Sequence, residues 1–120
     1  MLKGLPSPVI LTGSQRSSDR GSSDAQDNVR SALIAAKSDL SGVFVCMHEN
    51  LDDDACALHF GTKVRKMHTS RRDAFHSINT ALAARIFPAS GKFEKVSLLS
   101  TRRGSGKLAL DTKMNANVAL

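Results

Sequence analysis

The sequence predicts an α/β fold in which helices flank a mostly parallel sheet. Two continuous apolar stretches, 8–12 and 43–47, are separated by a polar loop and a segment with helical periodicity. Strand, loop, helix and strand within about 40 residues is typical of a βαβ unit. The chain has five Phe and neither Trp nor Tyr. We therefore expect an aliphatic core, as in sheets whose buried strands are runs of Val, Ile and Leu.

The first half of the chain contains the clearest elements. Residues 8–12 and 43–47 predict buried strands, and the polar stretch 14–23 predicts a loop. We expect a helix that begins at Ser23 or Asp24, because either side chain can serve as an N-cap. The side chains at helical spacing that would form its buried face are Val29, Ala32, Leu33, Ala36 and Leu40. Gly42 would end this segment before the second strand.

Shorter elements are predicted beyond residue 48. Residues 49–54 would form an acidic loop, 72–75 a single helical turn and 88–91 a turn. The segments expected to be extended are 55–60, 62–65, 85–87, 92–99 and 118–120. The stretch 100–106 is basic and rich in Gly, which favours a linker.

Charge and cysteine content limit the class of protein only loosely. The formal net charge is +6, which favours an anionic partner such as nucleic acid or a phosphorylated ligand. A basic surface without a specific partner explains it equally well. Cys46 and Cys56 form no CxxC pair, so we expect two reduced thiols rather than a zinc ribbon. No apolar run approaches the roughly 20 residues that span a membrane, and we expect a cytoplasmic protein.

Two polar regions could bind phosphate. The loop 13–23 precedes the predicted helix, whose N-terminus favours anions, but it matches neither GxGxxG nor GxxxxGK[ST]. Residues 104–107 resemble the end of a P-loop but lack its first Gly and its Ser or Thr. We therefore expect no nucleotide here, although the helix N-terminus could equally hold a ligand carboxylate.

Metal-ligating and basic side chains occur in the middle of the chain. The candidate ligands are His48, Glu49, Asp52, Asp53, Asp54, His59 and His68. Their spacing matches neither HExxH nor an EF-hand loop, so a solvated acidic loop with scattered histidines is the preferred interpretation, and no metal is expected. The basic stretch 63–72 permits three interpretations: contact with RNA phosphates, a solvated face, or one catalytic lysine. Spacing alone leaves these open.

Two motifs resemble one enzyme family. Residues 8–20 (PVILTGSQRSSDR), with 22–25 and Asn28, resemble the second part of the asparaginase/glutaminase type I domain. Residues 64–75 (VRKMHTSRRDAF), followed by 77–79, are similar to the segment that carries the family's catalytic lysine. Both are most similar to the D subunits of archaeal glutamyl-tRNA(Gln) amidotransferases, and free L-asparaginases match slightly less well. The resemblance runs from about residue 2 to residue 120.

The resemblance implies glutaminase-type hydrolysis. In the family a threonine hydroxyl attacks a carboxamide of glutamine or asparagine, and a threonine–aspartate–lysine relay activates the reaction. Lys66 matches the relay lysine. Ser14 matches a small residue of the substrate pocket, and Thr12 and Gly13 would support the same rim.

The resemblance also implies partners. Ammonia would pass to a partner subunit, which uses ATP and Mg²⁺ to activate the glutamate on mis-acylated tRNA, giving Gln-tRNA(Gln). No cofactor is expected in this chain, and a homodimer is implied for the full-length parent.

One departure from the family is serious. The T-G-G-T motif that carries the nucleophile and the H-G-T-D-T motif are both absent from this sequence, and residues 60–63 (FGTK) lack the aspartate. We therefore expect residues 1–99 to form a partial large domain, roughly its second half, and 100–120 to be a basic linker toward a missing C-terminal domain. Such a chain alone would be inactive, and an uncovered sheet edge would remain. If the chain is not part of such a full-length enzyme, the alternative is a non-catalytic, basic α/β binding module.

Overall fold

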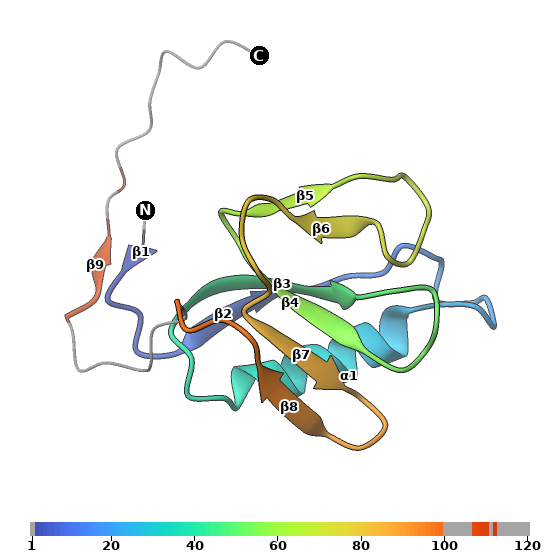
Figure 1. Cartoon of the computed structure of the whole chain (residues 1–120), viewed down its shortest axis with the longest axis horizontal. Helices are drawn as coiled ribbons and strands as arrows, with labels where there is room; N and C mark the ends of the chain where they lie inside the picture. The colour runs from blue at the N-terminus through green and yellow to red at the C-terminus, as the bar shows by residue number, and fades with distance from the viewer. Residues whose placement is uncertain (1, 100–106, 111, 113–120) are drawn as a thin grey trace, which may run out of the picture.

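The computed structural model describes residues 2–99, 107–110 and 112, and its centre is a five-stranded sheet with a helix on one face (Figure 1). The strands of this sheet, in spatial order, are β2 (Pro8–Leu11), β3 (Gly42–His48), β4 (Cys56–Phe60), β7 (Ala84–Phe87) and β8 (Lys92–Lys95). Only β2 and β3 run parallel, whereas the other three pairings are antiparallel. The predicted α/β class is confirmed, but the expectation of a mostly parallel sheet is wrong.

Connection length explains the direction of the strands. A parallel pair needs a crossover of about a dozen residues or more, whereas antiparallel neighbours can be joined by a short turn. Residues 12–41 hold the helix between β2 and β3, and this is the predicted βαβ unit. The loop 49–55 and the turn 88–91 are too short for a crossover, so β3–β4 and β7–β8 are antiparallel.

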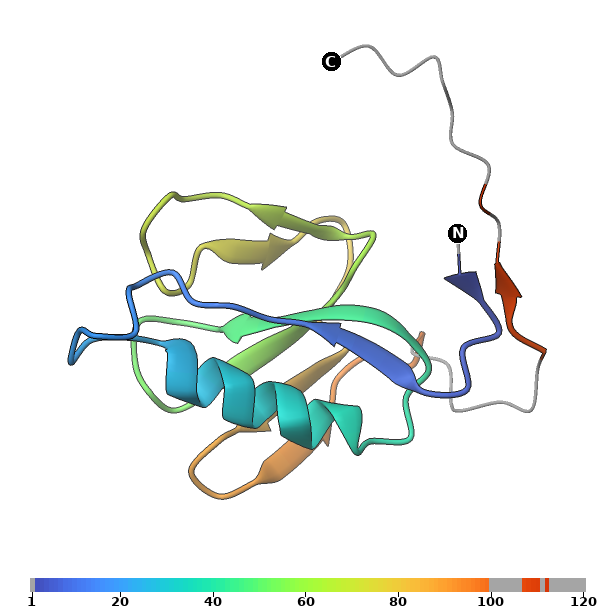
Figure 2. The same cartoon turned by 180° about the vertical axis from the view of Figure 1, so that it is seen from behind.

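Helix α1 (Ala25–Ala36) covers one face of the sheet and contacts β2, β3, β4 and β7 (Figure 2). Its buried residues are Asn28, Ser31, Ala32 and Ala35. Three of the five residues of the predicted apolar face are exposed, so this part of the prediction is wrong: Val29 is 49% exposed, Leu33 is 61% exposed, and Ala36 is also exposed. Small side chains at Ala32 and Ala35 bring the helix close to the sheet, where both join the buried core cluster. Leu40 also belongs to that core, but it lies beyond the end of the helix.

A hairpin covers part of the opposite face of the sheet. Its strands are β5 (Val64–Lys66) and β6 (Phe75–Ser77). Phe44, Cys46 and Leu58 belong to the helix-facing core, so the alternation of side chains places His59 on the other face. There the His59 ring nitrogen Nδ1 lies 2.8 Å from the hydroxyl oxygen of Ser77. The expected helical turn at 72–75 is wrong, because a turn leads directly into β6.

The remaining expectations concern the ends of the chain. The strands expected at 55–60, 62–65, 85–87 and 92–99 correspond to β4, β5, β7 and β8, with shifted bounds. β1 (Leu2–Lys3) and β9 (Ala109–Leu110) form a separate antiparallel pair, which stands apart from the main sheet in both views. The strand start at 118–120 and most of the predicted linker lie outside the described residues.

Strand β2 forms an open edge of the described sheet. It pairs with β3 on one side and with no other strand of the described residues. Val9 and Leu11 share the face away from α1, and Leu11 is 55% exposed. The uncovered edge expected from the sequence is therefore present, and such an edge invites pairing with another strand. No helix in the described residues is long and apolar enough to cross a membrane.

Candidate functional site

A buried carboxylate shapes the first polar loop, residues 12–24. Asp24, immediately before α1, is fully buried. Its side chain accepts hydrogen bonds from the backbone N–H groups of Gln15 and Arg16, each at 3.0 Å, and from Nδ2 of Asn28 at 2.7 Å. Asp24 occupies the predicted N-cap position, yet its side chain bonds no helical N–H group. It holds the loop instead.

The three predicted rim residues lie at the start of this loop. The hydroxyl of Thr12 donates to the carbonyl oxygen of Cys46 at 2.8 Å, which ties the end of β2 to β3. The carbonyl oxygen of Gly13 accepts from Nδ2 of Asn28 at 2.9 Å. Ser14 follows and is exposed. Two anchored residues therefore present the Ser14 side chain to solvent.

The second polar segment is the hairpin that carries Lys66. Lys66 ends β5, pairs with Phe75 across the hairpin and is exposed. Its ammonium nitrogen lies 5.9 Å from the centre of the Phe75 ring, a distance at which a cation–π attraction acts. The Met67 N–H donates to the carbonyl oxygen of Ala74 at 2.7 Å and closes the loop beyond the strands.

The fold brings the two segments together. The amide of Gln15 donates to the carbonyl oxygens of His68 at 3.4 Å and Arg71 at 3.1 Å. An open cavity of about 310 Å³ lies beside this link and is lined in part by Gln15. Its lining residues are Leu11, Thr12, Gly13, Ser14, Gln15, Val45, Met47 and Phe75. All three predicted rim residues line it, whereas Lys66 reaches its border through Phe75.

Ion pairs surround the lysine segment. Arg71 makes a bidentate pair with Asp73, and this pair lowers the pKa of the Asp73 carboxyl. Arg72 contacts the carboxylate of Asp53 and the carbonyl oxygen of Leu51, so it fastens the hairpin to the acidic loop. The basic stretch is therefore not a uniform solvated face, because two of its arginines already have acidic partners.

The geometry and the sequence agree with one protein family. The family model for the N-terminal domain of asparaginases matches residues 1–98. The chain belongs to the asparaginase family. The sequence-based resemblance is thereby confirmed.

Relatives and solved structures extend this assignment. The D subunit of glutamyl-tRNA(Gln) amidotransferase from Methanosphaera stadtmanae is 49% identical over 115 residues, which cover 96% of this chain and 26% of that protein. The D subunit from Thermococcus kodakarensis is 49% identical over 120 residues, which cover 100% of this chain and 27% of that protein. The chain thus spans about a quarter of the length of these relatives.

Two solved structures share the fold. The thermostable L-asparaginase from Thermococcus kodakarensis superposes with a TM-score of 0.76 at 30% identity, covering 92% of this chain and 30% of that one. A probable cytoplasmic L-asparaginase from Campylobacter jejuni gives a TM-score of 0.61 at 24% identity, covering 78% of this chain and 27% of that one. The similarity to the Campylobacter jejuni protein is evidence for the fold alone, because the sequence identity is only 24%.

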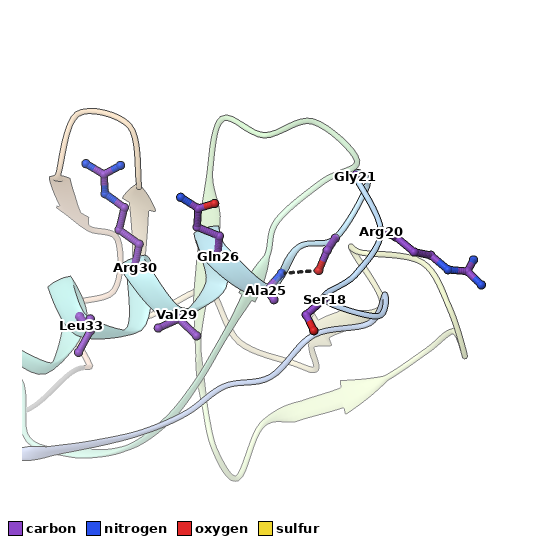
Figure 3. Close-up of a pocket in the computed structure, with 9 residues that line it drawn as sticks. Ser18, Arg20, Gly21, Ala25, Gln26, Val29, Arg30 and Leu33 are labelled. Carbon is purple, nitrogen blue, oxygen red and sulfur yellow. Dashed lines mark hydrogen bonds between the residues drawn. The ribbon is translucent and has the colours of Figure 1, made fainter.

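A larger hollow lies outside the candidate site of this asparaginase-family chain. It measures about 740 Å³ and lies beside the first turns of α1 (Figure 3). Its lining includes Arg20, Arg30, Val29 and Leu33. Figure 3 shows Arg20 and Arg30 pointing in different directions, so the two guanidinium groups do not converge on one anion. The smaller cavity beside Ser14 therefore remains the candidate.

A buried Cys–His–Asn group has the composition of a catalytic triad. Sγ of Cys56 lies 3.5 Å from Oδ1 of Asn28 and 3.9 Å from Nδ1 of His48. All three side chains are buried. Burial raises the pKa of the Cys56 thiol to about 11, so the thiolate that a nucleophile needs is disfavoured. We interpret the group as structural. Sequence reasoning missed it because its members lie far apart in the chain.

Proposed function

We propose that this chain supplies the substrate-pocket rim and the lysine arm of a glutamine-hydrolysing site in a tRNA-dependent amidotransferase. The observation that carries the proposal is the link between the two family motifs. Gln15 joins the rim loop to the hairpin of Lys66, and both border one cavity. Relatives that are named as D subunits of the amidotransferase, at 49% identity, support this assignment.

Three backbone N–H groups near the rim already have acceptors within the chain. The N–H groups of Gln15 and Arg16 both donate to Asp24, and that of Ala25 donates to the hydroxyl of Ser23 at 3.2 Å. These three N–H groups are therefore not available to bind a ligand. We assign the exposed hydroxyl of Ser14 as a polar group that contacts the amino acid substrate.

The chemistry needs a nucleophile from outside these 120 residues. In the proposed reaction a threonine hydroxyl attacks the side-chain carboxamide of glutamine. The C–N bond breaks, ammonia leaves with the proton that the relay transfers, and water then hydrolyses the acyl ester on the threonine. Lys66 is the relay lysine. Since neither family motif that holds a threonine nucleophile occurs in this sequence, the chain alone releases no ammonia.

In the proposed complex the ammonia moves to a partner subunit. That subunit activates the glutamate of mis-acylated Glu-tRNA(Gln) with ATP, and ammonia converts it to Gln-tRNA(Gln). ATP and Mg²⁺ then belong to the partner subunit, and the formal net charge of +6 suits a complex that contains tRNA.

A free L-asparaginase is the second candidate. The asparaginase from Thermococcus kodakarensis, with a TM-score of 0.76, favours it. The two candidates share the rim and the lysine and differ in substrate and destination of the ammonia. Identity of 49% with the amidotransferase subunits, against 30% with that asparaginase, favours the first.

A chimaera tests the function. This chain replaces the 120 matching residues of the D subunit from Thermococcus kodakarensis, and ammonia release is measured with glutamine and with asparagine. Glutamine hydrolysis is expected. Faster hydrolysis of asparagine than of glutamine would favour the asparaginase candidate. A correctly folded chimaera that hydrolyses neither amide would overturn both.

The role of Lys66 is tested in the same chimaera. Lys66→Ala should lower kcat by about 10³-fold or more, because residues of a catalytic relay act as a unit. Lys63→Ala, at a lysine just before the same strand, is the matched control and should retain activity. Activity of Lys66→Ala within a few-fold of the parent chimaera would show that the relay role is wrong.

A further inference from the structure

Asn28 is the centre of a buried hydrogen-bond network, and its contacts fix its orientation. Its Nδ2 donates to the carbonyl oxygen of Gly13 and to Asp24. Since both of these groups are acceptors, the amide nitrogen must face them. The amide oxygen Oδ1 therefore faces His48, whose Nδ1 lies 2.7 Å away.

This orientation decides the state of the His48 ring. An amide oxygen only accepts hydrogen bonds, so Nδ1 of His48 must carry a proton and donate it. In the neutral ring Nε2 then keeps its lone pair. His48 is 1% exposed, and its Nε2 lies 3.7 Å from Oδ1 of Asp53. A lone pair of the imidazole thus faces a carboxylate oxygen, and both atoms can serve as ligands of one metal ion.

A third donor completes the group. Asp27, in the first turn of α1, joins His48 at the end of β3 and Asp53 in the following loop, and the donor atoms lie within 4.8 Å of one another. Two ligands of a zinc ion, each at about 2.0–2.1 Å, are at most about 4.2 Å apart. The separation of 3.7 Å fits this limit. The Asp53 side chain is 70% exposed and can close the remaining distance by rotation.

From these contacts we propose that Asp27, His48 and Asp53 bind a divalent transition-metal ion of the zinc type. An imidazole with two carboxylates suits such ions, whereas Mg²⁺ and Ca²⁺ prefer oxygen ligands alone. Asn28 acts as the outer partner that orients the imidazole, as metal-binding histidines require. Of the candidate ligands identified from the sequence, only His48 and Asp53 belong to this group, and its third member, Asp27, was not among those candidates.

Arg72 competes for the same site. Its guanidinium group contacts the Asp53 oxygen that would bind the ion. The ion must displace Arg72 or share Asp53 with it, so removal of this arginine should strengthen metal binding. Direct contact of His48 with Asp53 is the arrangement that needs no metal, and the experiment separates the two.

The test uses the metal-free 120-residue chain, titrated with Zn²⁺ by calorimetry and with Co²⁺ by visible absorption. We expect one bound ion per chain and a rise in Tm with metal concentration. Asp53→Asn should weaken binding at least about tenfold, since loss of even an outer partner has that effect. Asp52→Asn, at the neighbouring carboxylate, is the matched control and should bind as the parent does. Arg72→Gln should bind more tightly.

Three outcomes would overturn the site. The first is the absence of saturable binding in the parent chain, which would leave His48 and Asp53 in direct contact without a metal ion. The second is equal binding by Asp53→Asn and Asp52→Asn. The third is a cobalt–thiolate absorption band that the Cys56→Ser variant lacks. Such a band would show that Cys56 is a ligand, which the proposed set of Asp27, His48 and Asp53 does not include. We expect the double variant His68→Gln, His76→Gln to bind the metal ion as the parent chain does. This result would exclude these two exposed imidazoles as ligands.

Discussion

The rim loop and the lysine hairpin border the same cavity but are stabilised in different ways. The rim loop is anchored by hydrogen bonds to Asp24 and Asn28, both fully buried. The loop of the hairpin is held by surface contacts, among them the pair Arg71–Asp73. Exposed ion pairs add little to stability, whereas removing one partner of a buried polar network is costly. The substrate rim is therefore the rigid part of the candidate site, and the lysine arm is the part that can move.

The largest expected effect follows from removing the anchor of the rim. Asp24→Ala leaves two backbone N–H groups and the Asn28 amide without their buried acceptor. We expect a loss of about 3–5 kcal/mol in the free energy of unfolding, as for other broken buried networks. Urea denaturation measures it.

A matched control comes from the same loop. Asp19 is exposed, and Asp19→Ala should change the free energy of unfolding by less than about 0.5 kcal/mol. Similar losses in the two variants would show that the buried network does not anchor the rim.

A smaller effect should appear when the pH is lowered, and it concerns the hairpin. His59 joins the sheet to Ser77 of β6. Burial lowers the pKa of His59 from 6.5 to about 4. The unfolded chain therefore binds a proton below pH 6.5 that the folded chain refuses until about pH 4, and stability falls between these values. The loss is at most about 3 kcal/mol.

Unfolding free energies measured from pH 7 to pH 4 check this prediction. His59→Gln removes the titrating group and should flatten the dependence on pH in this range. Amide exchange should also show that β6 loses protection at acid pH before the rim loop does. A His59→Gln variant with an unchanged pH dependence would assign the acid sensitivity to other groups.

The elements that the sequence predicted correctly are those with a strong local pattern of apolar residues. Residues 8–12 and 43–47 are strongly apolar, so two strands and the helix between them were predicted correctly. The direction of β4 was missed, although the short loop 49–55 is a usable signal for an antiparallel neighbour. Hydrophobic periodicity placed Val29 on the buried face, but that face is built around the polar Asn28.

The candidate site divides in the same way. Ser14 and Lys66 were assigned by resemblance alone, because family motifs record chemistry that spacing does not, and both assignments stay predictions. The roles of Asp24 and Asn28 were not predicted, since their partners lie on other segments: Asn28 meets His48 across 20 positions of sequence. Polar residues at Asp24 and Asn28, four positions apart on one helical side, were the available signal. Gln15 gave none, since its partners lie more than 50 positions away.

The smallest expected effect follows from cutting the side-chain link between the rim loop and the hairpin, because this change unfolds neither region. Gln15→Ala removes the side-chain amide that donates to the carbonyl oxygens of His68 and Arg71. These bonds are exposed, so the free energy of unfolding should fall by only about 1 kcal/mol or less. The backbone bonds from Gln15 and Arg16 to Asp24 remain, and the rim loop should keep its protection from amide exchange.

The loop 67–74 should respond differently, because Gln15 is its link to the rim. We expect faster amide exchange in this loop of Gln15→Ala, with Gln26→Ala as the control at an exposed glutamine of α1. In the chimaera described above, Gln15→Ala should lower kcat more than it raises KM, because Lys66 is then positioned less well while the rim is intact. Equal exchange in the two variants would mean that the hairpin holds its position without the rim, and that the lysine arm is as rigid as the loop it faces.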